Sequence, residues 1–131
     1  MSKQPVLLIV EDDQICAELL AYLLTRKGFA VFSFADGKAA QNWIASRREP
    51  VALALLDLML PLVDGYQLLR QIQNKKELAG TPVIILSAKT QEQDIVRAFE
   101  LGAADYVTKP FQVGELLARI IRCINKNQRH G

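Results

Sequence analysis

Short apolar runs alternate with longer segments of helical periodicity along this chain, and this alternation limits the folds open to it. The helical segments carry apolar residues three and four positions apart, as Leu20, Leu23 and Leu24 do. Strands that alternate with helices pair in parallel and bury both faces. The runs predicted as strands are Val6–Val10, Ala30–Phe34, Ala52–Leu56, Val83–Leu86 and Asp105–Thr108.

The helical segments carry their own boundary signals. Gly28 and Gly102 are suited to helix C-termini, and Thr90 with Gln93 predicts a capping box at the start of the fourth helix. The predicted helices are Gln14–Lys27, Lys38–Arg47, Gly65–Asn74, a fourth that ends near Leu101, and Val113–Ile124.

Five strand–helix units with right-handed crossovers predict an α/β fold. The expected architecture is a doubly wound, five-stranded parallel (βα)5 sheet in strand order 2-1-3-4-5, which is flavodoxin-like. The 131 residues suit one domain, and half of them are hydrophobic, which suffices for a core. We expect the domain to span residues 1–126 and a C-terminal tail to span residues 127–131.

Composition narrows the function classes. The formal net charge is +2 without a basic stripe, so direct nucleic-acid binding is not expected. The apolar runs are too short for a signal or transmembrane segment. Cys16 and Cys123 lie far apart, in no metal-binding spacing, which favours free thiols in a reducing compartment. We therefore expect a cytoplasmic protein that makes no membrane contact.

Polar residues follow four of the five strands, at the edge where doubly wound sheets carry their sites. Glu11 and Asp12 follow the first strand, Asp57 the third, Ser87 the fourth and Lys109 the fifth. Carboxylates so close repel one another and raise their own pKa values. Mg²⁺, which takes oxygen ligands, resolves this conflict. Acids, cation, lysine and hydroxyl together indicate a phosphoryl-transfer site.

Asp57 is the best candidate for the nucleophile of that site. A carboxylate can attack a phosphoryl group to form an aspartyl phosphate. Asp57 follows the central strand, whereas Glu11 and Asp12 flank it and are better placed to bind metal. Asp57 could instead only cap the next helix, but it lies too far upstream of Gly65, where that helix is predicted to begin.

These motifs closely resemble the receiver domains of bacterial response regulators, the CheY-like superfamily of two-component signalling. Each motif alone is common, but their order and spacing at four strand ends are specific. The resemblance covers Pro5–Lys126, and the matching stretches are Val10–Asp13, Asp57–Gly65, Ile85–Ala88 and Asp105–Phe111.

The resemblance implies a role for each site residue. Asp57 would be the phosphoacceptor. Asp12, Asp57 and the backbone carbonyl of Met59 would bind Mg²⁺ directly, and Glu11 would act through a metal-bound water. Lys109 would pair with the phosphoryl oxygens.

The resemblance also implies a switch. Ser87 would hydrogen-bond the phosphoryl group, and Tyr106 would turn inward behind it. The face made by the fourth helix, fifth strand and fifth helix would then change shape. The Lys109–Pro110 peptide bond is expected to be cis.

The implied protein is a signalling module, which assists its own phosphorylation and dephosphorylation and is not an enzyme in its own right. Its phosphoryl donor would be a sensor histidine kinase or a phosphotransfer protein. The response would pass to an output domain in the same chain or to a partner protein.

A phosphorylation-dependent homodimer through that face is a further expectation from one winged-helix subfamily. There, charged pairs join the two subunits. Asp105 and Arg119 match one such pair, but Ile95 replaces the basic partner expected for Glu115, and a third pair is apolar. The departures argue against this dimer and leave room for another partner surface.

Two alternative functions belong to other classes of protein. A pseudo-receiver would use the fold for binding without phosphorylation, but it would be expected to lack Asp57, Lys109 or an acidic residue, and none is missing. A nucleotide-binding flavodoxin-like enzyme would need a phosphate-cradling loop after the first strand. Here that loop is Glu11-Asp12-Asp13, which repels phosphate in the absence of metal.

Overall fold

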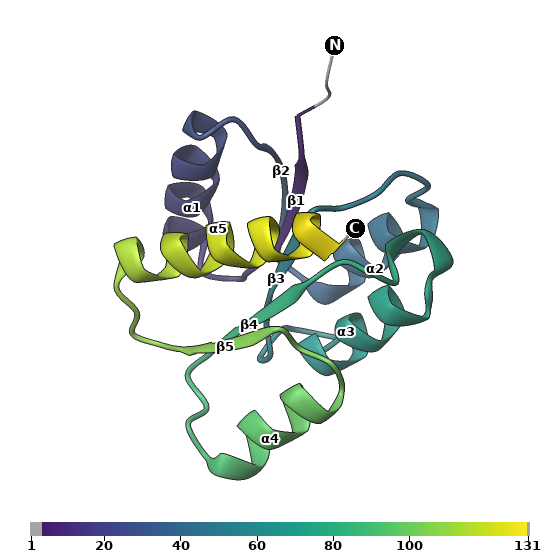
Figure 1. Ribbon diagram of the computed structural model, residues 1–131. Coiled ribbons are helices and arrows are strands. Elements are labelled where there is room, and N and C mark those ends of the chain that lie inside the picture. The colour runs from purple at the N-terminus through teal and green to yellow at the C-terminus, as the bar shows by residue number, and fades with distance from the viewer. Residues whose placement is uncertain (1–3, 131) are drawn as a thin grey trace.

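The computed structural model describes residues 4–130, with side chains through residue 127. Its five strands all pair in parallel in the order β2-β1-β3-β4-β5 (Figure 1), which confirms the predicted topology. Residues 1–3 of the predicted domain and residue 131 of the predicted tail lie outside the described residues. The strands are β1 (Val6–Val10), β2 (Ala30–Phe34), β3 (Leu53–Asp57), β4 (Val83–Ser87) and β5 (Asp105–Thr108).

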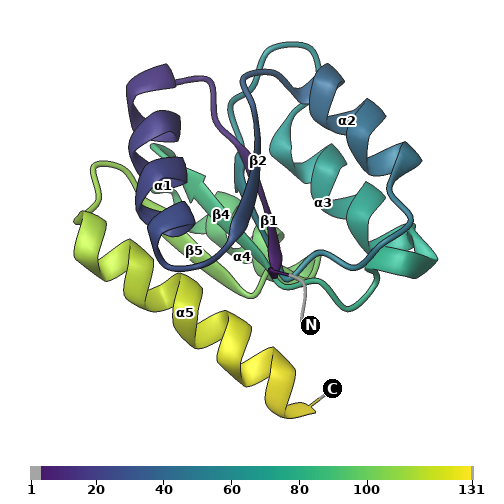
Figure 2. The same ribbon diagram turned by 90° about the horizontal axis from the view of Figure 1, so that it is seen from above.

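Helices cover both faces of the sheet. The helices are α1 (Gln14–Arg26), α2 (Gly37–Ser46), α3 (Gly65–Asn74), α4 (Glu92–Glu100) and α5 (Val113–His130), with a short 3₁₀ turn η1 (Lys76–Leu78). Figure 2 shows α1 and α5 on one side of the sheet and α2 and α3 on the other. Of the helices described, none is long and apolar enough to span a membrane.

Two apolar cores form because successive strand residues point to opposite faces of the sheet. Leu7 and Ile9 of β1 pack into the core beneath α1 and α5. Leu8 and Val10 of the same strand pack into the core beneath α2, α3 and α4. Every residue of β3 and β4 is buried. A closely packed core therefore supports the carboxyl ends of these two central strands.

Aspartate side chains cap the N-termini of two helices at the carboxyl edge of the sheet. The Asp13 carboxylate accepts the backbone N–H of Cys16 at 3.1 Å and caps α1. Asp64 and Gln67 form a reciprocal capping box at the start of α3. Such caps satisfy N–H groups that lack a partner in the first helical turn. They hold the loops after β1 and β3 against their helices.

The capping box predicted for α4 is wrong. The helix begins at Glu92, and its N-cap residue Gln91 makes no side-chain cap hydrogen bond. The Gln93 side chain donates instead to Gln91 Oε1 at 3.1 Å. Thr90 lies one position too far from the helix to cap it, so the residue spacing alone was misleading.

Helix α5 extends beyond the predicted end at Ile124. It runs from Val113 to His130, because its polar last residues are compatible with a helix and contain no glycine or proline. The end of the apolar stripe is therefore not the end of the helix. The division between domain and tail after Lys126 stays a prediction.

Candidate functional site

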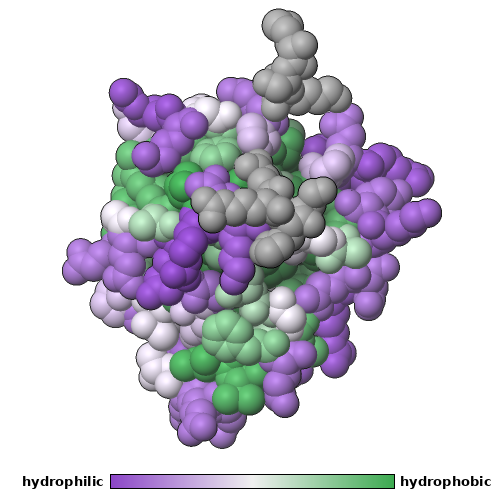
Figure 3. Space-filling model, viewed as in Figure 1, coloured by the Kyte–Doolittle hydropathy of each residue, from purple (hydrophilic) through white to green (hydrophobic). Residues whose placement is uncertain are grey.

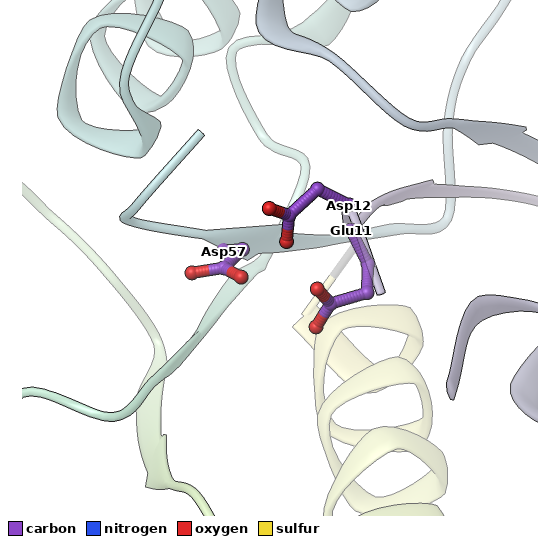
Figure 4. A group of neighbouring side chains, drawn as sticks. All are labelled: Glu11, Asp12 and Asp57. Carbon is purple, nitrogen blue, oxygen red and sulfur yellow. The ribbon is translucent and has the colours of Figure 1, made fainter. Parts of the chain in front are cut away.

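Three carboxylates meet at the carboxyl edge of the sheet. Glu11 and Asp12 follow β1, and Asp57 ends the neighbouring strand β3. One carboxylate oxygen of each residue lies within 4.8 Å of the others. Figure 4 shows the three side chains facing a common space. The acidic cluster predicted from the strand ends therefore exists as a spatial group.

Asp57 lies at the centre of the site and is held at both carboxylate oxygens. Its side chain is buried, with 4% of the residue exposed. Oδ1 accepts the backbone N–H of Met59 at 2.9 Å, and Oδ2 accepts a hydrogen bond from Lys109 Nζ at 2.9 Å. The two donors fix the orientation of the carboxylate.

Gly65 allows α3 to start directly against the end of β3. A Cβ atom at this position would overlap the backbone carbonyl oxygen of Asp57 and lie 2.9 Å from the Cα of Leu58. The Gly65 N–H donates to the Leu58 carbonyl at 3.2 Å. Only glycine fits this close approach, so the residue helps position Asp57.

Glu11 is an acid buried almost completely, with 1% of the residue exposed. Its Oε2 accepts the Asp13 N–H at 3.0 Å. Its Oε1 lies 2.6 Å from Lys109 Nζ, yet no hydrogen bond of regular geometry reaches that oxygen within the described residues. Burial raises the pKa of Glu11 to about 7, with a contribution from the Asp57 charge and against the opposing effect of Lys109.

Lys109 bridges the two strands' acids, because its ammonium group contacts both Glu11 and Asp57. Burial alone would lower the pKa of Lys109, but the two carboxylates outweigh it and raise that pKa above the ordinary lysine value. The Lys109–Pro110 peptide bond is cis, as predicted. Lys109 is also anchored through its backbone N–H, which donates to the Ser87 carbonyl at 2.9 Å.

A chain of hydrogen bonds joins Ser87 to Tyr106. Ser87 is fully buried, and its Oγ accepts the backbone N–H of Lys89 at 3.1 Å. The Lys89 carbonyl accepts the Tyr106 hydroxyl at 2.8 Å. Tyr106 is half-buried. The two predicted switch residues are thus connected through the loop between β4 and α4.

Tyr66 is a contact residue that the sequence did not reveal. Its buried hydroxyl donates to the backbone carbonyl of Asp94 at 3.0 Å, and the guanidinium carbon of Arg97 lies 4.1 Å from its ring centroid. Both contacts tie α3 to α4. Their long sequence separation leaves no local pattern to detect.

Four charged residues of β5 and α5 form ion pairs within the chain. Arg119 binds Asp105 at 2.9 Å and Glu115 at 3.0 Å, and Arg122 lies 3.7 Å from Asp105. Asp105 and Arg119, which match one of the pairs that join two subunits in the winged-helix subfamily, form their ion pair within one chain here.

The sequence matches a known family over most of its length. A model of the family described as "Response regulator receiver domain" matches residues 7–121. The chain is 42% identical over 120 residues to the response regulator GtcR of Aneurinibacillus migulanus, an alignment that covers 92% of this chain and 47% of that protein. The chain thus spans about half the length of the curated relatives it matches.

Solved structures of receiver domains are similar to this one. A CheY-like receiver domain protein from Methanospirillum hungatei JF-1 gives a TM-score of 0.89 at 24% identity, over 98% of this chain and 100% of that one, and supports the fold alone. The receiver domain of sensor histidine kinase PA1611 from Pseudomonas aeruginosa PAO1 gives 0.79 at 30% identity, over 93% and 98% of the two chains. That structure has a magnesium ion coordinated in the active-site cleft. The chain belongs to the response regulator receiver domain family.

Proposed function

We propose that this receiver domain accepts a phosphoryl group on Asp57 from a sensor histidine kinase or a phosphotransfer protein. The observation that carries the proposal is the setting of Asp57 at the end of the central strand. Its carboxylate lies within the acidic cluster and is held by Lys109 at 2.9 Å and by the Met59 N–H at 2.9 Å. The buried carboxylate is thus oriented before any donor arrives.

The donor set also fits a magnesium ion. The cluster offers carboxylate oxygens, which are the ligands Mg²⁺ prefers, and Glu11 Oε1 is buried without a regular hydrogen bond. We propose Asp12, Asp57 and the backbone carbonyl of Met59 as direct ligands, with Glu11 acting through a water. When bound, Mg²⁺ supplies positive charge for the phosphoryl oxygens.

The transfer itself requires little from the protein besides position and charge. An oxygen of Asp57 forms a bond to phosphorus as the phosphorus–nitrogen bond to the donor histidine breaks, and the imidazole nitrogen keeps the electron pair. Lys109 then pairs with the phosphoryl oxygens, since its ammonium group already lies 2.9 Å from Asp57 Oδ2. Later attack by water on phosphorus releases inorganic phosphate and restores the carboxylate. The domain thus acts as a signalling module rather than as an enzyme with an independent substrate.

Ser87 and Tyr106 form the proposed switch. The Ser87 oxygen accepts the Lys89 N–H, which leaves its hydroxyl proton free to donate to a phosphoryl oxygen. A shift of Ser87 toward that oxygen would weaken its bond to Lys89, whose carbonyl holds Tyr106. Tyr106 would turn inward behind Ser87, and the α4–β5–α5 face would change shape. This is a population shift between two forms.

The proposed outputs follow from family membership. An output domain in the same chain or a separate partner protein would sense the changed face, without direct nucleic-acid or membrane binding by this chain. A cytoplasmic location belongs to the same proposal. Because Arg119 pairs with Asp105 within the chain, a homodimer through this face would need to break or share that pair.

Beryllofluoride, a phosphoryl mimic, tests the proposal without a kinase. With Mg²⁺ it should shift the nuclear magnetic resonance signals of Ser87, Lys89 and Tyr106 beyond any change that Mg²⁺ alone produces, and beryllofluoride without Mg²⁺ should not. Asp57→Asn should abolish the shifts. Asp36→Asn is the matched control, because Asp36 caps α2 and asparagine caps equally well. Shifts that are absent from the parent, or unchanged in Asp57→Asn, would favour a pseudo-receiver.

A further inference from the structure

A groove runs along α5, on the face of the sheet that α1 also covers. Its volume is about 1040 Å³, and its floor consists of Leu117, Ala118 and Ile121. Leu117 and Ile121 are half-buried and pack against the core beneath them, whereas Ala118 is exposed. Figure 3 shows apolar surface between the regions of α1 and α5, bordered by hydrophilic side chains. None of these residues belongs to the site at the strand ends.

The groove has the length and periodicity of a helix-binding surface. Its α5 residues extend from Gly114 to Lys126, roughly 18 Å along the helix axis. They recur three and four positions apart and so form a single stripe along α5. A partner helix of about three turns would match this stripe, as in other helix-in-groove complexes.

The rim of the groove is positively charged. Lys27 lies on it from the end of α1, and Arg122 and Lys126 lie on it from α5. No acidic residue lines it among the residues described, and within the same part of the chain Lys27 and Lys126 form no ion pair. Arg122 lies 3.7 Å from Asp105, but Arg119 binds the same carboxylate at 2.9 Å. The rim therefore carries uncompensated positive charge.

We propose that this groove binds an acidic amphipathic helix of a partner protein. Apolar side chains of that helix would cover Leu117 and Ile121, and carboxylates beside them would face Lys27, Arg122 and Lys126. Charge complementarity of this kind favours correct partners and repels wrong ones. A second copy of this chain fits poorly, because a symmetric contact through α5 would bring Arg122 and Lys126 against like charges.

A displayed library of randomised helices of about 15 residues tests this assignment on the intact chain. Selected binders should combine an apolar stripe with an excess of Asp and Glu. Ala118→Arg places a bulky cation in the groove while keeping a good helix former, and should weaken their binding about tenfold or more. Lys27→Glu with Lys126→Glu should weaken it severalfold and reduce its sensitivity to salt.

Two controls make the result decisive. Arg70→Glu reverses an exposed cation on α3 and should leave binding unchanged, and unaltered unfolding curves should show that every variant folds. Selected helices without an acidic excess, or with full affinity for Ala118→Arg, would overturn the proposal. A dimer in sedimentation experiments that Ala118→Arg dissociates would also overturn it, because a second copy would then occupy the groove.

Discussion

The buried carboxyl of Glu11 makes a quantitative prediction about stability without metal. Its pKa is raised by burial from the ordinary value of 4.5 to about 7 in the folded chain. Between these two pH values the folded chain keeps a proton that the unfolded chain has released. Stability from this group is therefore fully present below about pH 4.5 and is lost as the pH rises through about 7.

The size of the effect follows from the separation of the two pKa values. At about 1.4 kcal/mol for each pKa unit, the interval between 4.5 and about 7 corresponds to ~3 kcal/mol of lost stability at high pH. Glu11→Gln keeps the shape of the side chain and cannot ionise, so it should abolish this loss.

Urea unfolding at a series of pH values with a metal chelator measures this quantity. The free energy of unfolding of Glu11→Gln relative to the parent should rise by roughly 2–3 kcal/mol between pH 5 and pH 8. Glu18→Gln is the matched control, because Glu18 is exposed on α1 and its side chain accepts a hydrogen bond from the Gln14 side chain at 3.1 Å. A parent and a Glu11→Gln variant with parallel pH profiles would refute the reasoning about Glu11.

Three further changes test the packing around the site. Leu56 lies in the core at 0% exposure, so Leu56→Ala should lower the free energy of unfolding by ~2–5 kcal/mol. Leu62 is 84% exposed, so the control Leu62→Ala should stay within ~0.5 kcal/mol of the parent. Equal urea midpoints for the two variants would contradict this. Tyr66→Phe removes the hydrogen bond from the Tyr66 hydroxyl to α4 and should lower the free energy of unfolding by ~1 kcal/mol. Amide hydrogen exchange should become faster in α4 alone. Faster exchange elsewhere instead would contradict a role of this hydrogen bond in holding α4. The methyl group of Gly65→Ala would overlap the end of β3 and should displace it. The variant should lower the free energy of unfolding by ~1–3 kcal/mol and slow the phosphorylation of Asp57. An unchanged rate of phosphorylation would show that the strand end tolerates the extra atom.

Much of this fold could be predicted from the sequence because its local and global signals agree. Leu53–Leu56 is wholly apolar, and in the structure every residue of it is buried beneath helices on both faces. Parallel pairing then brings the residue after each strand to one edge of the sheet. That rule predicts that Glu11, Asp12 and Asp57 lie together, and one carboxylate oxygen of each lies within 4.8 Å of the others.

The features that the sequence did not predict depend on contacts formed only in the folded chain. The Tyr66 hydroxyl bonds a carbonyl 28 residues away, and no spacing rule reports such a pair. The Thr90–Gln93 spacing matched a capping box, yet α4 begins too late to use it. Arg119 matches a position whose charged pair joins two subunits in one subfamily, whereas here it binds Asp105 of its own chain at 2.9 Å.

The central claim is that Asp57 carries the phosphoryl group, and chemical mapping of the phosphorylated residue tests it most directly. The protein would be incubated with Mg²⁺ and acetyl phosphate, reduced with borohydride, which converts an aspartyl phosphate to homoserine, and mapped by peptide mass spectrometry. We expect homoserine at position 57 only when Mg²⁺ is present, and none in Asp57→Asn. Homoserine at another acid, or its absence from the parent under conditions that keep it folded, would contradict the claim.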